Sequence, residues 1–274
     1  MKKRAKHEKI EKIQNALEGY RRFDYDYIPF GTHWTLPDKN FRYRKRGFDR
    51  IGVGFWRSML FLFGGILIGG CYGARVTGRK NLKAVKKTGC ISICNHFSFL
   101  DTLFVRQAVG QFRSFHTMGP KNNKTGLGGH IVRHGGMLPF SPNLEATRNL
   151  NAEIERLLKA GKIVNFYPEQ ALWTNYQKPR PMKDGEFHYA IKHNVPILPI
   201  FCTFQKDKKG HMHRLRINIL PAIYADENLA KKAKLADMKE RASEAWRACY
   251  ETAYAKTLEY LPDKRKGEEM NGKS

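Results

Sequence analysis

The sequence predicts an α/β fold in which a mainly parallel sheet is flanked by helices and preceded by a membrane-associating helical segment. Short apolar runs rich in β-branched residues, typical of buried strands, lie at residues 90–94, 162–167 and 195–204. Segments with helical spacing of apolar residues separate these runs, an alternation typical of parallel sheets covered on both faces. One long uncharged apolar stretch, residues 59–74, lies upstream of the first run.

The length of 274 residues allows one large α/β domain with appendages or at most two small domains, and a hydrophobic content of 41% is enough for a real core. We divide the chain into four segments: a basic and aromatic N-terminal arm (1–50), a membrane-dipping apolar segment (51–75), the α/β domain (76–225), and C-terminal amphipathic helices with a tail (226–274). The arm either lies on a membrane surface, where aromatic rings and arginines are favoured, or packs on the flank of the domain.

The net charge of +25 implies an anionic partner, which could be nucleic acid, an acidic membrane surface or a phosphorylated substrate. Charge alone does not choose among these. The lysines are spread along the whole chain, and no nucleic-acid-binding module is recognisable. We therefore expect an anionic membrane surface and no nucleic acid as partner. A non-enzymatic basic protein that binds nucleic acid or membranes is the rival interpretation.

The apolar stretch at residues 59–74 favours the membrane. Its sixteen residues fall short of the roughly 20 that a spanning helix needs, and its paired glycines weaken a straight helix. We expect it to dip into the membrane or lie at the interface, with Arg57 and Arg75 reaching the headgroups. A single span is the second interpretation, and a buried core helix is the third.

The five cysteines follow no disulfide framework, so we expect free thiols in a reducing compartment and a location at the cytoplasmic face of the membrane. Cys90, Cys94 and His96 could be imagined as zinc ligands. However, Cys90 and Cys94 share one face of the predicted strand, where free cysteine behaves as a small hydrophobe, and no second pair completes a site. The sequence thus predicts no metal.

The candidate for chemistry is the stretch from Asn95 to Asp101, which joins the strand at residues 90–94 to a predicted helix. A carboxylate five residues beyond His96 can turn back and accept the Nδ1 hydrogen, leaving Nε2 free as a general base. If the hydroxyl of the substrate is itself the nucleophile, the enzyme needs no nucleophilic serine or cysteine. In the alternative interpretation, Asp101 caps the helix and His96 is an ordinary loop histidine.

Three further signals follow in order: a glycine-rich basic segment about thirty residues later, Tyr167-Pro168-Glu169 at the end of a strand, and the run Val-Pro-Ile-Leu-Pro-Ile at residues 195–200. In this order and spacing, residues 76–204 resemble the glycerolipid acyltransferases of the 1-acylglycerol-3-phosphate acyltransferase (PlsC) type. The ordered set is far more specific than any of its members.

The resemblance implies a glycerol-3-phosphate acyltransferase-like fold and transfer of an acyl group from acyl-CoA or acyl carrier protein to the hydroxyl of a lysophospholipid. No cofactor is needed beyond this acyl donor. The implied catalytic residues are His96 as base and Asp101 as its orienting partner, and an oxyanion would need donors near the start of the following helix. The implied substrate-binding residues are Asn95, Lys121, Arg133, Glu169 and Lys183.

The chain departs from the family pattern in its third motif. Where members usually have Glu-Gly-Thr-Arg, this sequence has Glu169-Gln-Ala-Leu172, so the arginine that helps to hold the acceptor phosphate is absent. In the second motif the expected arginine falls near Ser141, unless Arg133 is the matching residue. A lyso-lipid without a terminal phosphate is therefore the alternative acceptor. Nearby cations could compensate: Lys178, Arg180 and Lys183.

Overall fold

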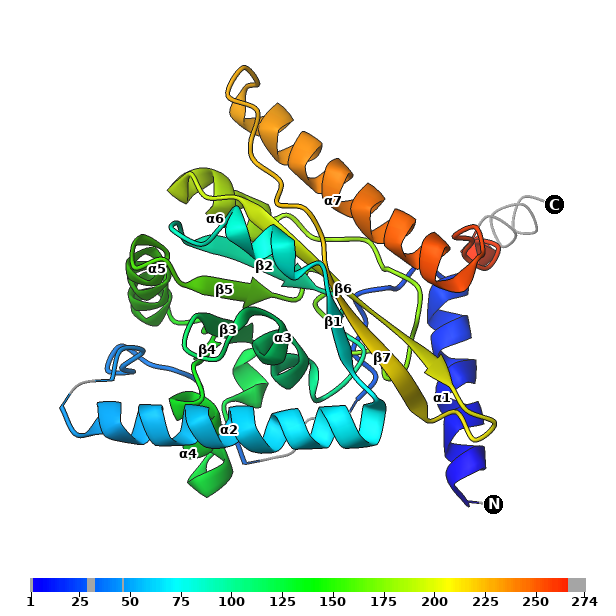
Figure 1. The fold of residues 1–274 in the computed structure, drawn as a ribbon, viewed down its shortest axis with the longest axis horizontal. Helices are drawn as coiled ribbons and strands as arrows, with labels where there is room; N and C mark the ends of the chain where they lie inside the picture. Colours follow the sequence, from blue (N-terminus) through cyan, green and yellow to red (C-terminus); the bar gives the residue numbers. More distant parts are fainter. Residues whose placement is uncertain (1, 29–32, 46, 266–274) are drawn as a thin grey trace.

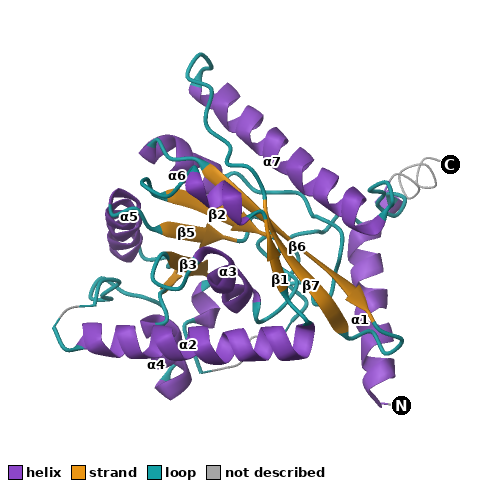
Figure 2. Ribbon diagram, in the orientation of Figure 1, coloured by secondary structure: helices purple, strands orange, loops and turns teal. Residues whose placement is uncertain are grey.

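The computed structural model describes residues 2–28, 33–45 and 47–265; the predicted arm and C-terminal tail thus fall partly outside the described residues. Within them, a seven-stranded sheet has the order β1-β7-β6-β2-β5-β3-β4 and is flanked by helices (Figures 1 and 2). The strands are β1 (Arg75–Thr77), β2 (Cys90–Cys94), β3 (Ser114–Met118), β4 (Met137–Pro139), β5 (Ile163–Phe166), β6 (Ile197–Lys206) and β7 (Met212–Ile219).

The helices alternate with these strands along the α/β domain. They are α1 (Lys2–Gly19), α2 (Asp49–Tyr72), α3 (Asp101–Val109), α4 (Gly126–His134), α5 (Leu144–Lys159), α6 (Gly185–His193) and α7 (Lys231–Tyr254), with short 3₁₀ helices η1 (Arg79–Lys83) and η2 (Pro120–Asn122). The described pairings are parallel except β6 with β7, which a tight turn at Gly210 joins as a hairpin. The predicted mainly parallel sheet is confirmed.

The central strand β2 is buried on both faces of the sheet. Ile91 and Ile93 face the core cluster beneath α5, α6 and α7, whereas Cys90 and Cys94 face the cluster beneath α3 and the end of α2. Both cysteines are fully buried, as expected for small hydrophobic residues. This two-sided burial explains why strand β2 reads as a continuous apolar run instead of a clean alternation.

Helix α2 is longer than the sequence indicated. It runs without a break for 24 residues, about 36 Å, and is long and apolar enough to cross a membrane. The paired glycines do not interrupt it, because Gly64 and Gly65 lie against the Leu103 and Gln107 side chains of α3 and allow close helix packing. The prediction of a short, weakened helix was therefore wrong.

Helix α2 has one face on the protein and one face open. Its buried face includes Arg57, only 2% exposed, which donates hydrogen bonds to the backbone carbonyls of Gln111 and Ser114. Arg57 therefore points into the protein and does not reach lipid headgroups, which corrects that expectation. The open face carries large apolar side chains: Ile51, Phe55, Phe61, Leu62, Phe63, Ile66 and Leu67.

The described part of the N-terminal arm packs on the flank of the domain. Phe23 stacks on Trp173 with ring centroids 6.0 Å apart, and Tyr43 donates to the Pro139 carbonyl at 2.9 Å. At the other end of the chain, the predicted one or two amphipathic helices form a single helix, α7, whose buried Trp246 packs against Phe201.

Candidate active site

The catalytic pair predicted from sequence is assembled where β2 ends. His96 lies in the loop after β2, and Asp101 is the first residue of α3. The His96 Nδ1 and Asp101 Oδ2 atoms are 2.7 Å apart. This confirms that the carboxylate turns back onto the imidazole.

Asp101 holds both the imidazole and the turn that carries it. Its Oδ2 also accepts hydrogen bonds from the backbone N–H groups of Phe97 at 3.0 Å and Ser98 at 3.1 Å. Burial raises the pKa of Asp101, and the hydrogen bond from His96 opposes that rise. The carboxylate therefore orients the histidine and fixes the turn before α3, whereas no side-chain hydrogen bond caps the N-terminus of that helix, so the capping alternative is not what the structure shows.

The geometry leaves one imidazole nitrogen available. Because a carboxylate accepts from Nδ1–H, the neutral ring carries its lone pair on Nε2. The His96 side chain is 21% exposed, whereas that of Asp101 is 1% exposed. A base with a buried orienting partner and an accessible edge can take a proton from a bound hydroxyl.

The Tyr167 ring lies against one face of the His96 imidazole, a contact that the sequence did not reveal. Its ring stacks on the His96 imidazole with centroids 4.3 Å apart and 25° between the planes. Burial raises the pKa of the Tyr167 phenol well above its usual range, and the nearby Asp101 charge raises it further. Tyr167 is a neutral aromatic surface for an imidazole that becomes cationic during proton transfer.

Glu169 acts on the backbone of the histidine. Its Oε2 accepts from the His96 N–H at 2.9 Å, and the same oxygen lies 2.6 Å from Arg180 Nη2. Arg180 also donates to the His96 carbonyl at 3.2 Å and to the Phe23 carbonyl of the arm at 2.8 Å. Glu169 and Arg180, predicted to bind substrate or compensate for the missing arginine, are both buried and instead hold the loop that carries His96.

A loop from residue 171 to 180 braces the same segment. Within it, the backbone N–H of Trp173 donates to the His96 carbonyl, and that of Asn175 donates to the Phe97 carbonyl. Glu18 of α1 secures this loop, because its carboxylate accepts from Tyr176 Oη and Lys178 Nζ and also from the backbone N–H of Leu261. Both ends of the described chain therefore support the loop behind His96.

The structure corrects the predicted role of Asn95. Its side-chain Oδ1 accepts from the Cys202 N–H at 2.8 Å, and its Nδ2 donates to the Cys202 carbonyl at 3.1 Å. Because both amide atoms bond to β6 and the residue is buried, Asn95 fixes the end of β2 and does not face substrate.

Two of the predicted cations are neutralised by the arm and α1. Lys183 lies 2.7 Å from Asp24, and Lys178 lies 2.7 Å from Glu18. These ion pairs tie the segment after Glu169 to the N-terminal region, so the structure does not bring Lys183 to the His96 edge as a free cation.

Lys121 and Arg133 follow β3, which ends at the same edge of the sheet as β2. Lys121 lies in η2, exposed at the surface. Arg133, in the last turn of α4, donates to the Asn123 side chain at 3.1 Å and to the Lys124 carbonyl at 2.7 Å. The carboxyl end of β3, which η2 follows, lies two strands from that of β2, about 10 Å along the sheet edge.

The expected oxyanion donors are not the first three N–H groups of the catalytic loop. Those of His96, Phe97 and Ser98 already donate to Glu169 or Asp101. The described residues also contain no cluster of three or more histidine, cysteine or acidic side chains that could hold a metal ion.

Comparisons with known proteins agree with the fold. The sequence model of the acyltransferase family matches residues 73–203. No curated protein sequence matches the chain. Among solved structures, the 1-acyl-sn-glycerophosphate (LPA) acyltransferase PlsC from Thermotoga maritima superposes with a TM-score of 0.58 at 17% identity. That match covers 79% of this chain and 87% of the other, and it confirms the predicted fold class.

Proposed function

We propose that the chain is a glycerolipid acyltransferase of the PlsC type and that it moves a fatty acyl group from acyl-CoA or acyl carrier protein to the free hydroxyl of a lysophospholipid; the acyltransferase family match and the PlsC-like fold support this. The leading acceptor is 1-acyl-sn-glycerol-3-phosphate, as a step in phospholipid biosynthesis. The observation that carries the proposal is the 2.7 Å contact between His96 and Asp101, which frees Nε2 of a partly exposed imidazole.

In the proposed reaction, His96 Nε2 removes the proton of the acceptor hydroxyl as its oxygen attacks the thioester carbonyl. A C–O bond forms, and collapse of the tetrahedral intermediate breaks the C–S bond. The proton then passes from the imidazolium to the departing thiolate, so His96 ends neutral. Asp101 and the Tyr167 ring both stabilise the imidazolium between these steps.

We propose that α2 holds the enzyme on the membrane that contains its acceptor. The open face of α2 is lined by large apolar side chains, whereas its other face lies against α3 and α4. A helix that is apolar on its outside and docked on the protein by Arg57 suits interfacial insertion parallel to the bilayer. The basic surface would favour the anionic cytoplasmic leaflet.

The acceptor headgroup depends on cations along the sheet edge. Lys121 and Arg133 are the proposed phosphate ligands, because Lys121 follows the carboxyl end of β3 and the Arg133 guanidinium contacts the segment directly after η2. The alternative is a lyso-lipid without a terminal phosphate, which the ion-paired states of Lys178, Arg180 and Lys183 favour. A panel of lyso-lipids with one acyl-CoA would separate them: preference for the lysophosphatidic acceptor would reject the alternative.

His96→Ala tests the reaction itself. The full chain in detergent or vesicles should lose acyl transfer, while circular dichroism and the melting temperature stay near those of the unmodified protein. His211→Ala is the matched control, because this exposed histidine lies on the β6–β7 turn and pairs with Asp207. Undiminished turnover by the His96 variant would reject the proposal. Salt-sensitive DNA binding without any acyl transfer would revive the rival basic binding protein.

A further inference from the structure

Two arginines lie buried together beneath α2 and α3. Arg57 of α2 and Arg106 of α3 are each 2% exposed, and both guanidinium groups donate to the backbone carbonyl of Gln111. Their other hydrogen bonds also go to carbonyls, from Arg57 to Ser114 and from Arg106 to Gly135, each at 2.6 Å. Within the described residues, no carboxylate lies within 4 Å of either guanidinium. Because a guanidinium keeps its proton at neutral pH, two positive charges meet here with no negative charge beside them.

His116 of β3 faces the same cluster. Ser114, two residues earlier on the strand, pairs with Ile163 of the core cluster beneath α3, so both β3 side chains face that helix. His116 is fully buried, and neither ring nitrogen has a hydrogen-bond partner within the described residues. Its backbone N–H donates to the Gly136 carbonyl, next to the carbonyl that Arg106 binds. Burial lowers the pKa of His116 well below its usual range, and the two arginine charges lower it further.

The unpartnered groups of this cluster are mostly hydrogen-bond donors. The described residues provide no acceptor for the Nε–H groups of Arg57 and Arg106, and the Ser114 hydroxyl has no partner among them either. The neutral His116 ring adds one N–H donor and one acceptor nitrogen, and Gln111 Oε1 adds a second acceptor. A water molecule would accept two of these hydrogens but leave both charges uncompensated. An anion accepts the hydrogens and also balances the charge.

The cluster is enclosed by protein, so its ligand has to be small. Arg57, Arg106 and His116 are at most 2% exposed. A lipid headgroup or a nucleotide has many atoms and needs an open pocket, whereas a monatomic ion does not. Among monovalent ions, chloride leaves water at a lower cost than fluoride because it is larger. The enclosure therefore favours a chloride-like anion.

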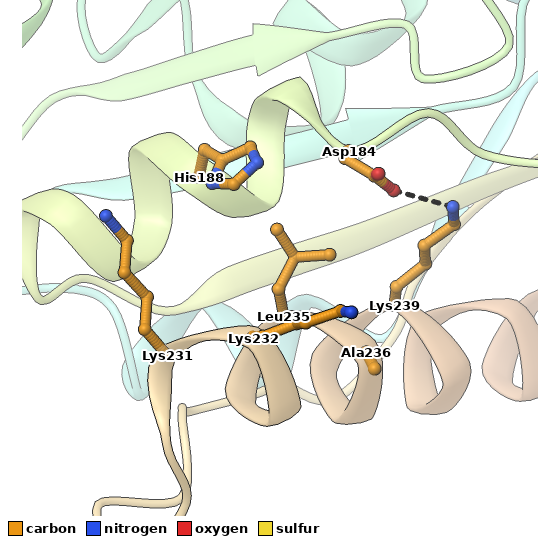
Figure 3. A pocket seen from close by; sticks show the side chains of 7 residues that line it. All are labelled: Asp184, His188, Lys231, Lys232, Leu235, Ala236 and Lys239. Atoms are coloured by element: carbon orange, nitrogen blue, oxygen red, sulfur yellow. Dashed lines mark hydrogen bonds and ion pairs between the residues drawn. The ribbon is translucent and has the colours of Figure 1, made fainter.

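The surface groove between α6 and α7 has more cations but lacks this convergence. Figure 3 shows the ammonium groups of Lys231 and Lys232 pointing apart, and Lys239 pairs with Asp184 at 2.6 Å. Lys231 and Lys232 are exposed, and water solvates such charges without a bound anion. These two lysines therefore serve as a control for general effects of salt.

We propose that Arg57, Arg106 and His116 form a buried binding site for a monovalent inorganic anion of the chloride class. The anion accepts hydrogen bonds from the two Nε–H groups and from the His116 ring. It thereby links α2, α3 and β3, the three elements that carry these side chains. The site goes beyond the proposed acyl transfer and does not depend on it. Its consequence is that a bound ion stabilises the docking of α2 on the domain.

Thermal unfolding of the full chain in detergent tests the site. Chloride replaces fluoride at constant ionic strength, so that general screening stays the same. The melting temperature should rise with chloride in a saturable way, by about 3 °C or more at roughly ten times the Kd. No rise, or a rise that does not saturate, would overturn the proposal.

Substitutions assign the rise to this cluster. Arg106→Met removes one of the two cations and should abolish the chloride-dependent rise. Arg113→Met is the matched control, because this half-buried arginine bonds to carbonyls outside the cluster. Lys231→Gln with Lys232→Gln removes two surface cations, and in both controls the rise should stay within about 1 °C of that in the unmodified protein. If Arg106→Met does not fold, His116→Leu keeps both cations and should raise the Kd for chloride about fivefold or more. A rise that Arg106→Met retains, an unchanged Kd in His116→Leu, or equal loss in the controls would contradict the assignment.

Bromide locates the ion, and the His96 variant separates the site from catalysis. In crystals soaked with bromide, the anomalous signal should lie between the side chains of Arg57, Arg106 and His116. A signal only at surface lysines would reject the site. His96→Ala should lose acyl transfer and keep the chloride-dependent rise. An unmodified protein that is inactive but keeps the rise would reject acyl transfer and retain the anion site, whereas an active protein without the rise would reject the anion site alone.

Discussion

Glu169 and Arg180 form a buried ion pair, 2.6 Å apart, that contacts both the N–H and the carbonyl of His96. Both side chains are at most 2% exposed, so neither charge has solvent as a substitute partner. The pair holds His96 through its backbone, while Asp101 orients its ring.

Removing one partner of this pair should destabilise the fold more than removing both. Arg180→Met leaves the Glu169 carboxylate buried without its cation, and we expect a loss of about 3–5 kcal/mol in the free energy of unfolding. Glu169→Gln with Arg180→Met should cost less than Arg180→Met alone, because it leaves no unpaired buried charge. Chemical denaturation of all four proteins measures this coupling. Additive losses would show that the two charges do not interact.

The Tyr167 ring should matter more to turnover than its hydroxyl. Tyr167→Leu removes the aromatic face beneath the imidazolium, so we expect kcat to fall about 2- to 30-fold, as an interaction of about 0.5–2 kcal/mol implies. Tyr167→Phe keeps that face and should retain most of the turnover. Steady-state assays with saturating donor measure kcat. A larger loss in the Phe variant than in the Leu variant would contradict this role.

Glu186 should make stability depend on pH. It lies in the first turn of α6, only 4% exposed, and burial raises its pKa to about 8. Because the folded protein holds this proton more tightly than the unfolded chain, Glu186 should lower stability as pH rises from about 4.5 to 8. Glu186→Gln should therefore stabilise the protein by on the order of 4 kcal/mol at pH 8 and by little near pH 4.5. Melting curves across this interval check the sign, and an equal shift at both pH values would contradict it.

The open face of α2 should control membrane association. Leu62→Lys with Phe63→Lys places two charges where we expect lipid, and vesicle binding should fall at least about tenfold. Leu144→Lys is the control, because this exposed leucine begins α5 on the other face of the sheet. Flotation with vesicles containing anionic lipid measures the difference. Equal binding by all variants would place the membrane contact elsewhere.

Much of the fold could be predicted because strong local patterns coincide with it. The predicted runs at residues 162–167 and 195–204 correspond to the buried strands β5 and β6, and the helix α6 lies between them, as the expected alternation of strands and helices requires. The contact of His96 with Asp101 was also predictable, because the two residues are only five apart in the sequence and a single local turn brings them together. The length of α2 was not, because Gly64 and Gly65 are stabilised by packing on α3, a contact that local propensity does not contain.

The residues that support His96 were harder to predict because they come from distant segments. Arg180 follows Glu169 by eleven residues, yet its role depends on how the intervening loop folds back over the catalytic turn. Asn95 is next to His96 in the sequence and was expected to face substrate. In the structure, its side-chain amide instead forms hydrogen bonds with the backbone of β6. Proximity to the motif in the sequence therefore identified residues that lie near His96, but not the groups that these residues contact.

Glu18 ties the first helix and the segment near Leu261 to the loop that braces the catalytic turn. During synthesis, that clamp closes only after nearly all of the described chain has left the ribosome. Until then the imidazole and its aspartate can meet, but the support behind them is incomplete. The support behind the imidazole thus depends on residues as far apart in the chain as Glu18 and Leu261, and a deletion that removes either should disturb a centre that neither residue touches.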